Sequence, residues 1–171
     1  MKKILVLLLG LILIPFSAAP LVSNYIPFSP LLSVSAMTTS QDPNGFGDVH
    51  WDETISDTQI SHKTALLGRN GDATHYSVLI PDAKGSLNFE GPVTIRAIFI
   101  DNKLFGIEIP FSGDQFETRL AGMTKMLGTP VKRRGYYIWG GPLSLIILLP
   151  YKDDGLIILA KNQQGVQGIA I

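Results

Sequence analysis

The chain has 171 residues, 46% hydrophobic and 16% charged, with 14 basic residues against 14 acidic residues and no cysteine. This length fits one domain, or one domain with a targeting segment. The lack of cysteine excludes disulfide scaffolds, thiol nucleophiles and cysteine-ligated zinc. The balanced charge argues against a bulk electrostatic partner such as a nucleic-acid backbone, and the high hydrophobic fraction excludes general disorder.

The N-terminus has the layout of a secretory signal peptide, in which a short basic head precedes an apolar run over residues 4–14. Small residues permit cleavage after Ala19 or after Ala36, so we expect residues 1–36 to be a leader and the protein to be exported, either periplasmic or secreted. The alternative is an uncleaved membrane anchor through residues 4–19. Those 16 residues are fewer than the roughly 20 that a spanning helix needs.

Removing the leader changes the charge balance of the chain. Lys2 and Lys3 leave with it and no acidic residue does, which leaves 12 basic against 14 acidic residues. The remaining chain of roughly 135 residues is long enough for one hydrophobic core. Residues 37–47 are rich in turn formers and are expected to be a flexible lead-in. Residues 48–171 are expected to form a single α+β domain.

A β-hairpin is predicted between residues 93 and 109. Apolar residues alternate with polar ones from Val93 to Phe99, and a second alternating run follows from Leu104 to Ile109. Between them, Asp101 and Asn102 tolerate the positive φ angles of a two-residue turn.

A helix over Gly113–Leu127 is the best-specified element of the chain. Ser112 and Gln115 fit a capping box, and Phe111 occupies the first position of a hydrophobic staple. Gly128 stands where a helix often ends in a left-handed residue. Four apolar residues at helical spacing share one stripe: Phe116, Leu120, Met123 and Leu127.

Further strands are predicted after this helix. The three β-rich segments, separated by turn formers, are Gly135–Trp139, Leu143–Leu149 and Leu156–Lys161. Residues 145–149 are apolar at every position, which indicates a central strand covered on both faces. Thr54 and Asp57 fit a cap, so a second short helix is expected within residues 54–67. The prediction is an α+β fold with a mostly antiparallel sheet of about five to six strands and one well-defined helix on one face.

No motif in the sequence assigns a reaction. His50, His62 and His75 are spaced by 12 and 13 residues, which matches no local metal-ligand signature. The sequence contains no nucleophile elbow, phosphate loop or dinucleotide fingerprint. We therefore predict no catalytic residue, no metal site and no cofactor. The alternative is a small exported hydrolase whose carboxylate and histidine meet only in the folded chain.

One candidate binding surface combines a basic run with the aromatic residues that follow it: Lys132, Arg133, Arg134, Tyr136, Tyr137 and Trp139. Such a mixture binds single-stranded nucleic acid in other proteins, but export makes a lipid head group, a cell-wall polymer or another envelope protein the expected partner. The structural alternative is that one aromatic pair faces the core while the charges keep the strand entrance soluble. Self-association into a homo-oligomer is also expected, because an exposed edge beside so apolar a strand would need covering.

Three short motifs occur in a recurring order: FGDVHW at residues 46–51, LGTP at residues 127–130, and Trp139 after an aromatic strand. This order resembles that of small exported bacterial proteins that open with a Phe-Gly and Trp-Gly motif and continue with a hairpin, a helix, a Leu-Gly-x-Pro break and a tryptophan-bearing strand. Asp52 stands in place of their second glycine. The resemblance covers about residues 46–161 and implies an envelope location and an α+β fold. That group has no assigned activity, so no catalytic residue is carried over.

Overall fold

The computed structural model describes residues 37–38, 40–151 and 153–162. The predicted leader with both of its cleavage sites lies outside the described residues, and so does the C-terminal stretch 163–171. No helix in the described part is long and apolar enough to cross a membrane.

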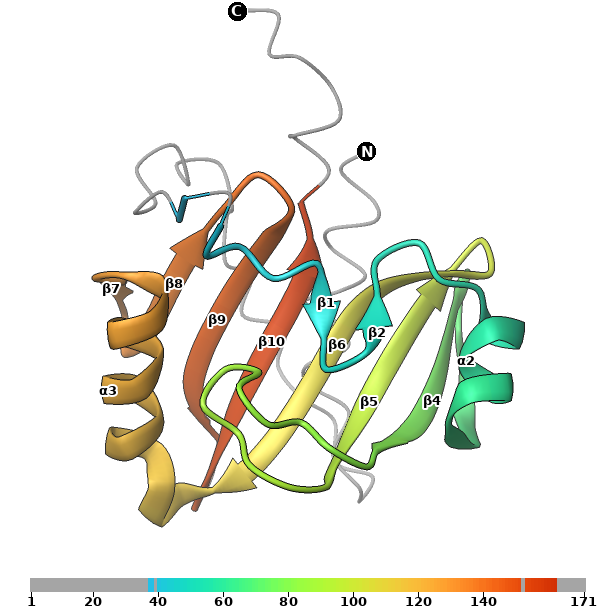
Figure 1. Ribbon diagram of the computed structural model, residues 1–171, viewed down its shortest axis with the longest axis horizontal. Coiled ribbons are helices and arrows are strands. Elements are labelled where there is room, and N and C mark those ends of the chain that lie inside the picture. Colours follow the sequence, from blue (N-terminus) through green and yellow to red (C-terminus); the bar gives the residue numbers. More distant parts are fainter. Residues whose placement is uncertain (1–36, 39, 152, 163–171) are drawn as a thin grey trace, which may run out of the picture. The chain divides into compact units, whose positions relative to one another are not determined.

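Eight antiparallel strands form one sheet in the order β3-β4-β5-β6-β10-β9-β8-β7 (Figure 1). They are β3 (Lys63–Asn70), β4 (Ala73–Ile80), β5 (Val93–Ile100), β6 (Lys103–Ser112), β7 (Val131–Arg133), β8 (Tyr136–Gly140), β9 (Ser144–Tyr151) and β10 (Asp154–Lys161). A small pair, β1 (Gly45–Phe46) and β2 (Val49–His50), stands apart from this sheet. The α+β class and the antiparallel sheet are confirmed, whereas the predicted count of five to six strands is wrong.

The sheet consists of two halves with the same order of elements. In the first half α2 (Ile55–Ser61) precedes the meander β3-β4-β5-β6. In the second, the 3-10 turn η2 (Gly113–Gln115) and α3 (Phe116–Leu127) precede the meander β7-β8-β9-β10. The last strands of the two meanders, β6 and β10, pair antiparallel at the centre of the sheet, with Ile109 opposite Ile157. The topology therefore repeats about an axis between these strands, although the sequence shows no repeat.

The sequence did not predict β3 and β7, and each was missed for an identifiable reason. The window 54–67 contains both a helix and the start of a strand: Thr54 and Asp57 make the predicted capping box, but α2 ends at Ser61 and β3 begins at Lys63. β7 has only three residues, two of them basic, which is too short for a periodic signal.

The best-specified helix begins later than predicted. Its first three residues form the 3-10 turn η2, and Ser112 makes no side-chain cap hydrogen bond, so the predicted capping box there is wrong. Instead, the side-chain oxygen of Gln115 accepts from Arg119 at 3.1 Å. The staple is confirmed, because the rings of Phe111 and Phe116 stack with their centroids 6.2 Å apart. Gly128 ends the helix, as expected, but with φ of 88° and ψ of −176° it does not adopt the left-handed helical conformation.

A layer of helix, loop and strand covers one face of the sheet and encloses the core. Figure 1 shows α3, the β1–β2 pair and the loop of residues 81–92 in front of the strands, with α2 at the β3–β4 end. The apolar stripe of α3 joins the core as predicted: Met123 and Leu127 are buried, and Phe116 and Leu120 pack against the core cluster. Trp51 is also buried, and its indole N–H donates to Ser144 Oγ at 3.0 Å.

Residues 37–47, expected to be a flexible lead-in, pack against the sheet where they are described. The Met37 N–H donates to the carbonyl of Gly140 at 2.8 Å, and both Met37 and Phe46 are buried in the core. The Asp42 carboxylate accepts from the backbone N–H of Ser144 at 3.2 Å. The turn formers place this segment outside the sheet, as expected. The contacts of Met37 and Asp42 nevertheless anchor it to the sheet, and the segment forms one wall of a cavity.

The approach of α3 to the 81–92 loop predicts an unusual effect of Gly122→Ala. Alanine favours an isolated helix over glycine by about 1 kcal/mol. Here the added Cβ would lie 2.3 Å from Nδ2 of Asn88 and 2.9 Å from its Cβ. We expect the overpacked variant to lose about 1–3 kcal/mol in the free energy of unfolding, measured by urea denaturation.

The double variant Gly122→Ala/Asn88→Gly is the matched control for this prediction. It removes the clashing side chain, and glycine readily adopts the φ of 62° found at position 88. It should recover the stability of the unmodified protein. A single Gly122→Ala variant at least as stable as that protein would show that the loop does not press on the helix.

Candidate functional site

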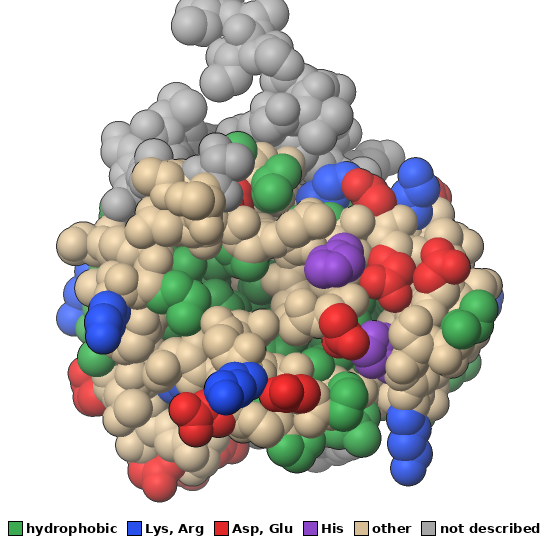
Figure 2. All heavy atoms as spheres, in the orientation of Figure 1, with side chains coloured by type: hydrophobic (Ala, Val, Ile, Leu, Met, Phe, Trp, Pro, Cys, Tyr) green, Lys and Arg blue, Asp and Glu red, His purple; other side chains and the backbone are tan. Residues whose placement is uncertain are grey.

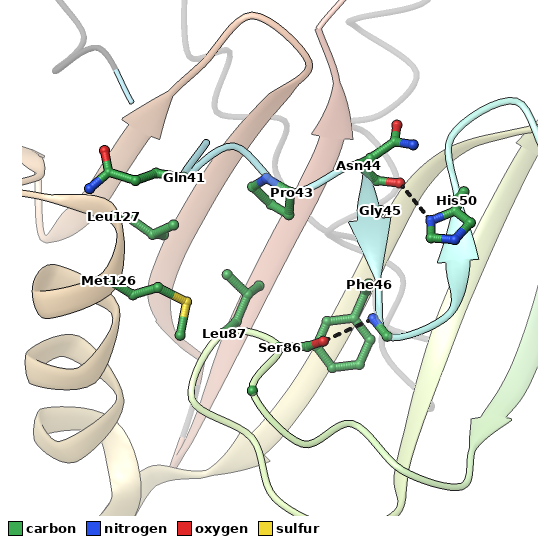
Figure 3. Close-up of a pocket in the computed structure, with 12 residues that line it drawn as sticks. Gln41, Pro43, Asn44, Gly45, Phe46, His50, Ser86, Leu87, Met126 and Leu127 are labelled. Atoms are coloured by element: carbon green, nitrogen blue, oxygen red, sulfur yellow. Dashed lines mark hydrogen bonds between the residues drawn. The ribbon is translucent and has the colours of Figure 1, made fainter. Parts of the chain in front are cut away.

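A cavity of about 230 Å³ opens on the covered face of the sheet. Its walls come from the lead-in, the 81–92 loop and the C-terminal end of α3, and Figure 2 shows hydrophobic side chains gathered in a hollow in this region. Figure 3 shows the lining residues: Gln41, Pro43, Asn44, Gly45, Phe46, Gly47, His50, Gly85, Ser86, Leu87, Met126 and Leu127.

The two sides of the cavity are connected by direct contacts. The Gly47 N–H donates to Ser86 Oγ at 3.2 Å, which joins the β1–β2 turn to the 81–92 loop. The rings of Phe46 and Phe89 meet edge to face with centroids 5.6 Å apart. Because these contacts join segments about 40 residues apart in sequence, the hydrophobic periodicity of neither segment predicts the cavity.

The 81–92 loop has a strained backbone at the cavity wall. Leu87 and Asn88 have φ of 48° and 62°, in the left-handed region that bulky residues rarely occupy. Arg119 of α3 fixes this conformation: its guanidinium lies 3.7 Å from the centroid of the Phe89 ring and donates to the carbonyl of Asn88. Burial lowers the pKa of Arg119, while the nearby Glu90 acts in the opposite direction.

The three histidines considered as metal ligands do not converge. His50 is exposed at the cavity, with Nδ1 3.3 Å from the carbonyl oxygen of Asn44. His62 is buried, with Nε2 3.6 Å from a carboxylate oxygen of Asp48. His75 lies in β4, on the face of the sheet opposite the core. In the part of the chain that the structure describes, no group of three or more histidine or acidic side chains is placed to hold a metal ion.

An ion pair between a partly exposed arginine and a buried glutamate lies on the sheet face opposite the core. The Arg96 guanidinium donates to the Glu108 carboxylate at 2.8 Å. Burial raises the pKa of Glu108, and the charge and hydrogen bond of Arg96 partly oppose this. His75 shares this face because it alternates with Ser77, which pairs with Arg96. Burial, together with the charge of Arg96, lowers the pKa of His75.

The sequence prediction missed this pair because of a β-bulge. A two-residue turn at 101–102 with regular pairing would place Arg96 opposite Ile107. The register shifts by one residue after Phe99, so Arg96 pairs with Glu108 instead. A shift of one residue moves a side chain to the other face of a sheet. No residue pattern in the hairpin indicates where the bulge falls.

The predicted basic and aromatic surface is only partly at the surface. Lys132, Arg133 and Arg134 are exposed at the outer edge of the sheet, in β7 and the turn that follows it. The Lys132 ammonium lies 5.1 Å from the centre of the Tyr137 ring. Tyr136 and Tyr137 are half-buried. Trp139 is fully buried, and its indole N–H donates to the carbonyl of Gly128 at 2.7 Å, so Trp139 cannot belong to a surface.

The alternative expectation was that one aromatic pair of this segment faces the core. It holds for Tyr137 and Trp139, because Trp139 is part of the core and Tyr137 packs against it. Self-association was expected because an apolar strand would leave an edge exposed. The apolar strand β9 lies between β8 and β10, so both of its edges are paired. The edge strand on this side is β7, and its shortness and charge disfavour pairing with another chain.

Comparisons with protein-family models, curated proteins and solved structures give no match to this chain. The fold and the sites define an α+β protein with a large antiparallel sheet, a covered face that contains a cavity, and a basic hairpin at one edge of the sheet. The resemblance to small exported bacterial proteins stays a prediction. One local detail is compatible with it: Asp52, in place of their glycine, has φ of 67°.

The environment of His75 predicts a pH dependence of stability. Because the folded protein lowers the pKa of His75 below its ordinary 6.5, the unfolded chain binds a proton at pH values where the folded chain resists it. Stability from this residue is therefore present above about pH 6.5 and lost as the pH falls towards the lowered value. We expect His75→Gln to remove this loss, measured as the free energy of unfolding in urea at pH 7.5, 6.5 and 5.5. Parallel pH profiles for the two proteins would contradict this role.

Proposed function

We propose that this chain is an exported, non-enzymatic binding protein of the cell envelope. Its basic hairpin, defined here as Lys132, Arg133 and Arg134, binds a phosphate-bearing anion, either a lipid head group or a cell-wall polymer. Export is supported by the layout of residues 1–36. A membrane-tethered form would differ only in whether that segment is retained, and the binding surface would be the same.

The conformation of Arg134 is the observation that carries this proposal. Arg134 and Gly135 connect β7 to β8 with φ of 47° and 86°, the signs required at both positions of a type I′ turn. Asparagine, aspartate and glycine are favoured at such positions, and the turn at Asp101-Asn102 of this chain uses two of them. Arginine there costs about 1 kcal/mol. A charged residue at a strained, exposed position supports a binding role.

The chemistry of the hairpin suits an anionic partner. A guanidinium offers planar, paired donors that match the oxygens of a phosphate group, and an ammonium adds a point charge. Lys132 is partly ordered by the Tyr137 ring beneath it, which reduces the entropy that its side chain loses on binding. Among the described strands β7 is the outermost on its side of the sheet, so a long polymer can approach it without crossing another of them.

The distribution of titratable groups favours binding over the hydrolase alternative. Among the residues that line the cavity, His50 is the one histidine, and no acidic side chain is present. The histidine and carboxylate with shifted pKa values, His75 and Glu108, lie outside the lining, with Arg96 paired to Glu108. A hydrolytic site of the expected kind requires such groups to face one substrate-sized space.

Arg134→Asn separates a binding role from a structural one. Asparagine tolerates the left-handed conformation, so the variant should be more stable by about 1 kcal/mol. It should also bind a soluble glycerol-phosphate oligomer about fivefold more weakly at low salt, because one cation near an anion contributes about 1 kcal/mol. Both quantities are measurable on the same samples, by urea denaturation and by titration calorimetry. A soluble oligomer avoids any contribution of residues 1–36 to vesicle binding.

Lys63→Asn is the matched control, since it removes one exposed cation from β3, the strand at the opposite edge of the sheet. It should leave the oligomer affinity unchanged. If Arg134→Asn and Lys63→Asn bind as well as the unmodified protein, the basic hairpin is not the binding surface.

A further inference from the structure

We propose that the cavity beside α3 is a second binding site, and that it takes one uncharged aromatic group. This inference stands apart from the proposed function, because the cavity shares no residue with the basic hairpin. It depends on the chemistry of the cavity wall, its size and the way it is held open.

The wall is apolar and includes groups suited to aromatic rings. Phe46, Leu87 and Leu127 are buried, and Figure 3 shows the side chains of Leu87 and Met126 beside the hollow. The Phe46 ring forms another part of the wall, and ring edges and faces attract each other beyond their area of contact. The Met126 thioether is flexible and makes favourable contacts with aromatic rings. Among the lining residues, none is an acid, a lysine or an arginine.

Three of the four polar side chains at the rim are engaged within the protein or turned away from the hollow, and the fourth, His50, is exposed there. The Gln41 side-chain oxygen accepts from the N–H and the hydroxyl of Thr38, at 3.2 and 2.8 Å. The Ser86 hydroxyl accepts from the Gly47 N–H. Figure 3 shows the Asn44 amide directed away from the hollow. A ligand in the hollow therefore meets mainly apolar surface, and a charged group that lies away from His50 would lose its hydration without a partner.

The size of the cavity suits a single ring. Its 230 Å³ is below the range of roughly 300–1,000 Å³ that is usual for drug-sized ligands. It exceeds the cavity of about 150 Å³ that suffices for benzene in an apolar protein core. The site therefore fits one ring with a small substituent, either as a free molecule or as a substituent of a larger one.

The loop that forms one wall is fixed in a conformation that keeps the cavity open. The left-handed Leu87 and Asn88 would relax if the loop were free, but Arg119 clamps Asn88 and Phe89 from α3. Ser86 ties the same loop to Gly47 on the opposite side. Strain that the surrounding structure maintains is typical of ligand sites. A site formed in advance also loses little conformational entropy on binding.

Methyl NMR on the full chain tests this site with toluene as the probe. The chain has four methionines, so their labelled ε-methyl signals can be resolved. Met126 lines the cavity, whereas Met123 is fully buried in the core three residues away on the same helix. Toluene should shift the Met126 signal in a saturable way and leave Met123 nearly unchanged. Benzoate and benzylamine, which are charged, should bind at least tenfold more weakly. Indole linked to a short peptide is titrated in the same way, and it tests whether the site binds a ring that is a substituent of a larger molecule.

Met126→Trp fills the cavity and should weaken the affinity for toluene at least tenfold. The affinity is measured from the rise in Tm that toluene produces. Glu117→Gln, on the same helix but outside the lining, should keep the affinity. Where Met126→Trp does not fold, Met126→Gln replaces it, since it keeps the length of the side chain and makes it polar. The proposal is overturned if Met126 shows no saturable shift, if benzoate binds as well as toluene, or if the folded Met126 variant binds toluene normally.

Discussion

The antiparallel pairing of β6 with β10 is the interaction on which the rest of this structure depends. It joins two four-stranded meanders, and the chain between the paired strands, about 40 residues, must return across the sheet through α3 before the pair can form. Closing a loop of that length costs entropy before any contact is gained. The apolar residues on the core face of both strands, such as Ile109 and Ile157, compensate by burial. Gly155 is required in this pairing, because a Cβ there would lie 2.1 Å from the Phe111 ring.

The same arrangement determines where the two binding surfaces lie. Because each meander ends at the centre, the strands that begin the meanders, β3 and β7, become the edges of the sheet. The basic hairpin is therefore an edge feature, where charge disfavours unwanted strand pairing. The cavity is a feature of the covering layer. It forms where the lead-in, the 81–92 loop and α3 meet over the core, and it is held by a few contacts between them: Ser86 with Gly47, Phe46 with Phe89, and Arg119 with Asn88.

Local patterns in the sequence were sufficient for local structure. The turn at Asp101-Asn102, the apolar stripe of α3 and the cap of α2 were all predicted, because each depends on residues within one or two turns of each other. Features that depend on register or on distant segments were not. A bulge moved Glu108 to the face of Arg96, and the turn-rich lead-in was anchored by Asp42 to a strand about 100 residues away. The basic hairpin was visible as a charge run, but the left-handed conformation of Arg134 is a property of the folded turn. The cavity had no sequence signal, because its walls come from three separate segments.

Native-state hydrogen exchange tests most directly the claim that the β6–β10 pair makes the two halves one cooperative unit. We expect the slowest amides to lie in β6 and β10, and those of Ile109 and Ile157 to exchange with the same free energy, equal to that of global unfolding. The amides at the outer strands, including β7, should open at lower free energy. The claim would be contradicted if the amides of β8, β9 and β10 exchanged together at a lower free energy than those of β4, β5 and β6, since the second half would then unfold while the first stayed intact.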